Sequence, residues 1–202
     1  MPRTEEAYQQ IRTERREQIL QAAAQVFARK GLATATITDI AAQAGVSHGL
    51  LYRHFASKEE VFAAVIDQSL ANAERLAQSA LAQPGTPWER ICWITERIFP
   101  GTSLGNRPGY FMVVLHALTN EDVPEHIRAQ AAKQGNVIYN VIRQFISDGQ
   151  EAGQVIVGDP DQLARCYLAC IQGLVIGSQF NVRSQANLPP MEMVLRILHA
   201  EE

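Results

Sequence analysis

The feature that most constrains this chain is the short turn Gly45-Val46-Ser47 between two short amphipathic segments. Glycine accepts the positive φ that a sharp helix end needs, and serine is a favoured N-cap for a following helix. Before the turn, Thr36 and Asp39 have the spacing of a capping box with Asp in place of Glu. The pattern predicts two helices, over residues 36–44 and 48–55, that meet at this turn.

Longer helices are expected on both sides of this pair. Ile19, Ala23, Val26 and Phe27 recur at helical spacing, which predicts a helix from about residue 12 to residue 30, ended by Gly31. Ser57-Lys58-Glu59-Glu60 forms a second capping box and predicts a long helix to about residue 83. Further helices are expected over residues 88–99, 110–118, 124–152, 160–182 and 191–199.

The expected fold class is all-α, with about nine helices, because strand signals are almost absent outside Val155-Ile156-Val157. We expect a three-helix domain over residues 1–58 and a larger helical domain over residues 59–202. Hydrophobic residues make up 47% and charged residues 19%, as in ordinary globular proteins. No apolar run has the ~18–20 residues of a membrane span. With no secretory signal visible and an odd number of cysteines, a cytoplasmic protein with reduced thiols is expected.

The net charge of −3 is unevenly distributed. Residues 1–58 hold eight Lys/Arg against five Asp/Glu, whereas residues 59–202 hold ten against sixteen. The chain therefore has a mildly basic head that can approach phosphates and an acidic body that cannot wrap them.

Two short helices joined by a glycine-containing turn predict a helix-turn-helix. In that motif the small Ala41 and Ala44 allow close packing, Val46 fills the core, and the start of the second helix faces the DNA major groove. The alternative is an ordinary helical hairpin, because Gly-Val-Ser alone is a weak signal. The longer combination over residues 36–62 favours DNA binding.

Residues 36–62 closely resemble the DNA-binding signature of the TetR (tetracycline-repressor-like) family. The resemblance lies in Asp-Ile-Ala, Ala-Gly-Val-Ser, Gly-x-x-Tyr-x-His-Phe and Ser-Lys-Glu-Glu, spaced without insertion. It is close over residues 14–65 and architectural beyond them. It implies a homodimeric transcriptional regulator, usually a repressor, whose two heads bind a palindromic operator. It also implies a small effector held by the larger domain and a dimer formed through the last two helices. Gly173 and Gly177 allow close helix approach there, and a helix crossing within the chain is the alternative for them.

Residues that position the protein on the DNA backbone are expected around the second helix. Tyr52 and His54 occupy the family's phosphate-facing positions, and both side chains can donate to phosphate oxygens. Lys58 lies in the first turn of the next helix, where its ammonium group favours a phosphate. Thr36 is expected mainly to cap its helix, and also to donate a hydrogen bond to a phosphate. A packing role for Tyr52 and a solvated Lys58 are the alternatives.

Base reading is expected to fall to His48, Gly49 and Leu50, after the N-cap Ser47. Leu50 departs from the small hydroxyl residue that the family resemblance leads us to expect, and it can pack on a thymine methyl. Leu51 and Phe55 are expected in the core. The segment that carries Arg3, Arg12, Arg15 and Arg16 either reaches the minor groove or nearby phosphates, or is a solvated tail.

The larger domain holds a set of aromatic, sulfur-containing and polar side chains from which an effector pocket could be built. Plain core packing is the alternative for each of them. If they line a pocket, its ligand would be apolar or aromatic, with His116 or Asn140 as a polar anchor. The candidates are Trp93, Phe99, Tyr110, Phe111, Met112, Leu115, His116, Tyr139, Ile142, Cys166 and Cys170.

An enzyme is not expected, because the chain has no Gly-x-Ser-x-Gly elbow, P-loop, HExxH or dinucleotide glycine pattern. Cys166 and Cys170 lack a second ligand pair, so neither a metal nor a cofactor is expected. Two buried small side chains are expected there, with redox sensing as the alternative. A DNA-binding factor without an effector, or an activator, also remains open.

Overall fold

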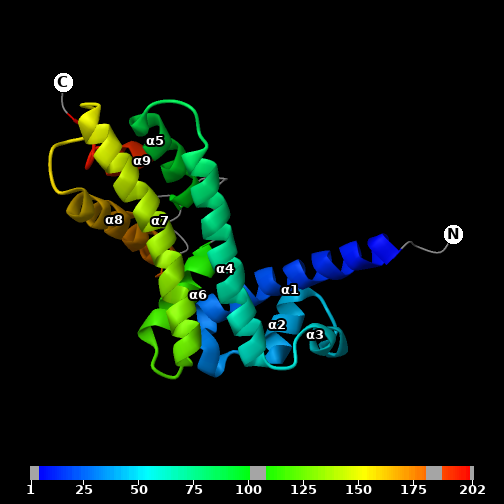
Figure 1. Ribbon diagram of the computed structural model, residues 1–202. Coiled ribbons are helices and arrows are strands. Elements are labelled where there is room, and N and C mark those ends of the chain that lie inside the picture. The colour runs from blue at the N-terminus through cyan, green and yellow to red at the C-terminus, as the bar shows by residue number, and fades with distance from the viewer. Residues whose placement is uncertain (1–4, 101–107, 181–187, 201–202) are drawn as a thin grey trace. The chain divides into compact units, whose positions relative to one another are not determined.

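The computed structural model describes residues 5–100, 108–180 and 188–200. These ranges contain helices and no named strand, and the all-α prediction is confirmed (Figure 1). In chain order the helices are α1 (Glu5–Thr34), α2 (Ile37–Ala44), α3 (His48–His54), α4 (Lys58–Leu81), α5 (Pro87–Ile98), α6 (Pro108–Thr119), α7 (Glu125–Glu151), α8 (Pro160–Phe180) and α9 (Met191–Leu195).

Two helix ends differ from the sequence prediction. α1 begins at Glu5, earlier than predicted. Its first turns are polar and show no apolar stripe, so the sequence does not predict them as helical. Gly31 has φ 70° and ψ 177°, so it interrupts α1 where the sequence predicts a helix-ending glycine. One more helical turn follows Gly31, and α1 ends at Thr34. α9 ends at Leu195 and not near residue 199, since Val155 and His199 instead form an isolated antiparallel bridge.

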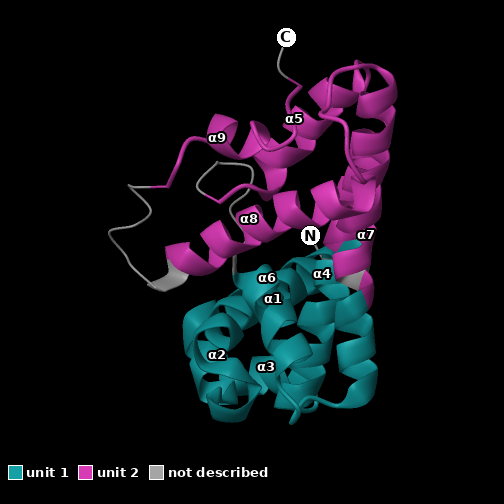
Figure 2. Cartoon of the chain, turned by 90° about the vertical axis from the view of Figure 1, so that its left-hand side faces the viewer, with its two compact units in different colours: residues 1–71, 109–132 teal, residues 72–108, 133–202 magenta. Residues whose placement is uncertain are grey.

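The chain divides into two compact units (Figure 2). The first unit comprises residues 1–71 and 109–132, and the structure describes it from residue 5 onward. Its core holds Phe27 and Phe62, whose rings meet edge to face with centroids 5.0 Å apart. Leu51 and Phe55 are buried in the same core, as predicted. The assignment of residues 1–58 and 59–202 to separate functional domains stays a prediction.

Helix α6 packs closely on α1 within the first unit. A Cβ atom at Gly109 would lie 3.4 Å from the backbone of Ala24, so glycine permits this close approach. Further along α6, the imidazole Nε2 of His116 lies 3.4 Å from the carbonyl oxygen of Ala28. Residues far from the helix-turn-helix in sequence therefore contribute to the core that supports it.

The second unit comprises residues 72–108 and 133–202, including α5, α8 and α9. α5 starts at a capping box between Thr86 and Glu89. Tyr167 of α8 is fully buried, and its hydroxyl forms a hydrogen bond with the hydroxyl of Thr95 in α5. Burial raises the pKa of Tyr167 well above its usual range, so the phenol stays neutral and holds α5 against α8.

No helix in the described ranges is long and apolar enough to cross a bilayer.

Candidate nucleic-acid interface

The start of α2 is fixed by the predicted capping box. The Thr36 hydroxyl accepts a hydrogen bond from the Asp39 N–H at 3.1 Å, and the Asp39 carboxylate accepts from the Thr36 N–H at 3.0 Å. Lys30 of α1 forms an ion pair with the same carboxylate at 2.8 Å. Hydrogen bonds from Lys30 and Thr36 lower the pKa of Asp39 to about 2. The carboxylate therefore remains charged at neutral pH and ties α2 to α1.

The turn between α2 and α3 has the geometry that its sequence predicts. Gly45 lies in the left-handed region, with φ 64° and ψ 34°. Its N–H donates to the Ala42 carbonyl, and the Val46 N–H donates to the Ala41 carbonyl at 3.0 Å. These are the two bonds of a Schellman motif, which ends a helix and turns the chain sharply.

Helix α3 presents its first turn to solvent. The Ser47 hydroxyl accepts a hydrogen bond from the Leu50 N–H at 3.2 Å and so caps the helix. His48 and Gly49 are exposed, and Leu50 is partly exposed, whereas Leu51 is buried. The three residues predicted to read bases thus lie on the accessible edge of α3, and their contact with DNA stays a prediction.

Two of the predicted phosphate donors, Tyr52 and Lys58, differ in how accessible their side chains are. Tyr52 is 55% exposed, which argues against the alternative of a packing tyrosine. Lys58 is partly buried, and its ammonium donates to the Ala33 carbonyl at 3.3 Å. A phosphate at Lys58 would therefore compete with this carbonyl or share the ammonium with it. Ser57 caps α4 through the Glu60 N–H, while the Glu60 carboxylate accepts from the Ala56 N–H.

His54 is the third predicted phosphate donor, and it lies at the last position of α3. Its side chain is partly buried, and burial lowers the pKa of the imidazole. The positive charges of Arg12 and Arg16 lower this pKa further. The sequence named these two arginines as candidates, but nothing in their spacing showed that they would lie beside His54.

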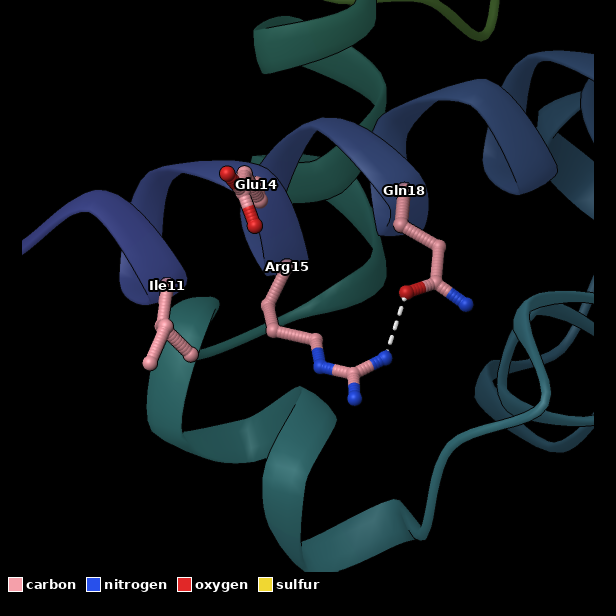
Figure 3. A pocket seen from close by; sticks show the side chains of 4 residues that line it. All are labelled: Ile11, Glu14, Arg15 and Gln18. Carbon is pink, nitrogen blue, oxygen red and sulfur yellow. Dashed lines mark hydrogen bonds between the residues drawn. The ribbon is translucent and has the colours of Figure 1, made fainter. Parts of the chain in front are cut away.

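Gln18 is a residue that the sequence interpretation missed. Its amide donates to the Ala44 carbonyl at 2.7 Å, which satisfies a free acceptor at the end of α2. Arg15 in turn donates to the Gln18 amide oxygen at 2.7 Å (Figure 3). These side chains, with Ile11 and Glu14, line an open hollow of about 390 Å³ along α1. A polar hollow lined by a single helix differs from the apolar effector pocket that the sequence predicts.

The predicted pocket residues fall in both compact units, and each group is described by itself. In the first unit, Tyr110 is buried in the core, while Phe111, Met112, Leu115 and His116 are partly buried. In the second unit, Phe99 and Ile142 are buried, and Trp93 and Tyr139 are partly buried. Asn140, the alternative polar anchor, is exposed. A ligand role for any of them stays a prediction.

The expectation that Cys166 and Cys170 are buried is wrong for the single chain. Both thiols lie on the exposed face of α8, and Tyr167 between them points into the core. The sequence shows that this part of α8 is apolar, but it does not show which face is covered by its own chain. Cys92 is partly buried, and burial raises the pKa of its thiol.

The comparison with known families agrees with this geometry. The family model of bacterial regulatory proteins, tetR family, matches residues 19–65, which run from the first buried residues of α1 into α4. Over residues 19–65 the chain is therefore similar to the TetR family. The matched range contains the capping box at Thr36, the turn at Gly45 and the whole of α3.

Two curated relatives match parts of the chain. An HTH-type transcriptional repressor of Mycobacterium tuberculosis is 46% identical over 61 residues, which cover 30% of this chain and 32% of that protein. The transcriptional activator FasR of Mycolicibacterium smegmatis is 38% identical over 88 residues, covering 44% of this chain and 40% of FasR. The chain thus spans about a third of the first relative's length and less than half of the second's.

One solved structure extends the likeness to most of the chain. A putative transcriptional regulator from Saccharomonospora viridis, solved in complex with choline, superposes with a TM-score of 0.69. The superposition covers 91% of this chain and 93% of that one, at 24% sequence identity. At this identity the likeness establishes the fold alone.

Proposed function

We propose that this protein is a DNA-binding transcriptional regulator, and that it acts as a homodimeric repressor on a palindromic operator. The observation that carries the proposal is the edge of α3, where His48, Gly49 and Leu50 are accessible beside the exposed Tyr52. Base-reading and phosphate-positioning groups on one short helix are what a helix-turn-helix needs in the major groove.

The dimer is proposed to form through the last two helices, mainly through α8. An exposed face of α8 carries Cys166, Ala169, Cys170 and Gly173, and a Cβ atom at Gly173 would meet no other atom of the chain. Such small residues allow two helices to approach closely. α9 contributes less, because its five residues make about 7 Å of helix.

A small, largely apolar effector is proposed to release the DNA. The partly buried aromatic rings of Trp93 and Tyr139 in the second unit support a ligand of this class. The related Saccharomonospora viridis regulator was solved with choline, so a small molecule is a reasonable type of ligand for this fold. Thermal-shift screening with apolar, aromatic and highly charged compounds tests the class, and binding of highly charged compounds alone would contradict it.

Selection of bound duplexes from random DNA tests the proposed function directly. A palindromic consensus is expected, and recovery of no sequence above background would refute operator binding. Tyr52→Phe and Lys58→Ala should weaken binding to all recovered sequences to similar extents, because phosphate contacts carry no sequence information. His48→Ala and Leu50→Ala should instead change which sequences are recovered, by about 1–3 kcal/mol at the affected base pairs.

Activation is the second candidate, favoured by the relative that is named an activator. The direction of regulation depends on where the operator lies relative to a promoter, and the same protein–DNA contacts serve both. A reporter gene behind the selected operator, measured with and without the protein, separates repression from activation.

A further inference from the structure

The first half of α1 is a helix with almost no core of its own. Among the described residues before Ile19 none is buried, and Ile11 is only partly buried. Figure 1 shows this end of α1 extending beyond α2 and α3. An isolated helix of this length is marginally stable in water. We therefore expect this half of α1 to gain order from a binding partner.

Two arginines of this half-helix lie beside the end of α3. Arg12 and Arg16 are four residues apart, so they leave the same face of α1. The Arg16 guanidinium lies 5.2 Å from the centroid of the Phe55 ring. Both guanidinium groups act electrostatically on His54. Three groups that can carry positive charge therefore converge from two helices.

No carboxylate balances this cluster among the residues that the structure describes. The ion pairs found there join Lys30 to Asp39 and Arg97 to Glu96. The charged groups that act on His54 from α1 are both cationic, and its neighbour in α3, Arg53, is cationic too. An anion placed among these side chains would relieve their mutual repulsion.

We propose that Arg12, Arg16 and His54 together bind one phosphate group of the DNA backbone, so that the exposed half of α1 becomes ordered on the duplex. This inference rests on the proposed DNA binding and adds α1 to the elements that contact the backbone. Guanidinium groups suit phosphate oxygens because they donate several hydrogen bonds in a fixed plane. A phosphate beside the imidazole also favours its charged form, so binding draws a proton onto His54.

Affinity for DNA should consequently depend on pH. In the free protein, burial and the two arginines hold the pKa of His54 below its ordinary value, and the bound phosphate raises it. Between these two pKa values, the binding constant increases as the pH falls. The slope is up to about one log unit per pH unit for each bound protomer, because one proton is taken up.

Fluorescence anisotropy with the operator duplex recovered by selection tests the proposal. Arg12→Gln and Arg16→Gln together should weaken binding on the order of tenfold and reduce the salt slope by about one per protomer. They should also flatten the pH dependence, because the imidazole is then less repelled before DNA binds. Arg29→Gln is the matched control, since it removes an exposed positive charge from the same helix and should change neither slope appreciably.

His54→Gln isolates the proton uptake, because glutamine keeps a hydrogen-bond donor but does not titrate in this range. This variant should lose the pH dependence that the wild type shows, while His126→Gln, which changes an exposed histidine of α7, should retain it. Circular dichroism of each variant without DNA verifies that the fold is intact.

Two results would overturn the inference while the proposed function stands. One is operator binding by the double arginine variant with wild-type salt and pH slopes. The other is a change in the preferred sequence without a change in the salt slope, which would mean that α1 reads bases. Failure of the wild type to bind any duplex would refute the proposed function itself.

Discussion

At the scale of the residue, the carboxylate of Asp39 makes three stabilising contacts. It caps α2, holds Thr36 and forms the ion pair with Lys30. Its pKa falls from an ordinary 3.8 to about 2 on folding, so the charged form stabilises the folded state. That stabilisation is complete above about pH 4 and is lost as the pH falls towards about 2.

Asp39→Asn should therefore lower Tm by a few degrees at neutral pH, because the ion pair and the charged cap are lost. The difference from wild type should shrink as the pH falls from about 4 to about 2, where the wild-type carboxylate also becomes neutral. Thermal unfolding followed by circular dichroism at several pH values measures it. Glu17→Gln, which removes an exposed carboxylate with no ion pair among the described residues, is the control. A difference that did not change with pH would contradict this account of Asp39.

At the scale of the element, two glycines four residues apart have opposite roles. Gly45 needs its left-handed conformation to end α2, whereas Gly49 is helical within α3. A Cβ atom at either position would meet no other atom within 4 Å, so only the backbone conformation distinguishes them.

Gly45→Ala should destabilise the protein by about 1–2 kcal/mol, the cost of a left-handed non-glycine residue. Gly49→Ala should stabilise it by about 0.5–1 kcal/mol, since alanine favours a helix interior. The added methyl group should nevertheless weaken operator binding if the α3 backbone approaches the major groove. Urea unfolding and anisotropy measure the two effects separately. Equal stability changes for the two variants would contradict the assignment of Gly45 as the turn residue.

The elements of this chain could be predicted where local chemistry determines them. The capping box at Thr36 and the turn at Gly45 involve residues within a few positions of one another, so sequence spacing is enough. The cluster of Arg12, Arg16 and His54 could not be predicted, because it depends on how α1 packs against α3. The exposure of Cys166 and Cys170 could not be predicted either, since an apolar helix face suits both an interior and an interface between copies.

At the scale of the whole molecule, the proposed dimer explains why α8 leaves a face of small residues in solvent. A single helix-turn-helix makes few base contacts, and two heads on a palindrome multiply specificity. The apparent affinity for the operator then depends on protomer concentration, because only the dimer engages both half-sites.

Ala169→Glu should disrupt this dimer, because a buried carboxylate and its symmetry-related copy would repel each other at the interface. Sedimentation at micromolar concentration should find two protomers for the wild type and one for the variant. Operator affinity should fall by about tenfold or more, since the monomer loses half of its contacts. Ala132→Glu adds the same charge at an exposed alanine of α7 and should leave the dimer intact. A dimeric Ala169→Glu variant would exclude this face of α8 as the interface, and a monomeric wild type would refute the dimer altogether.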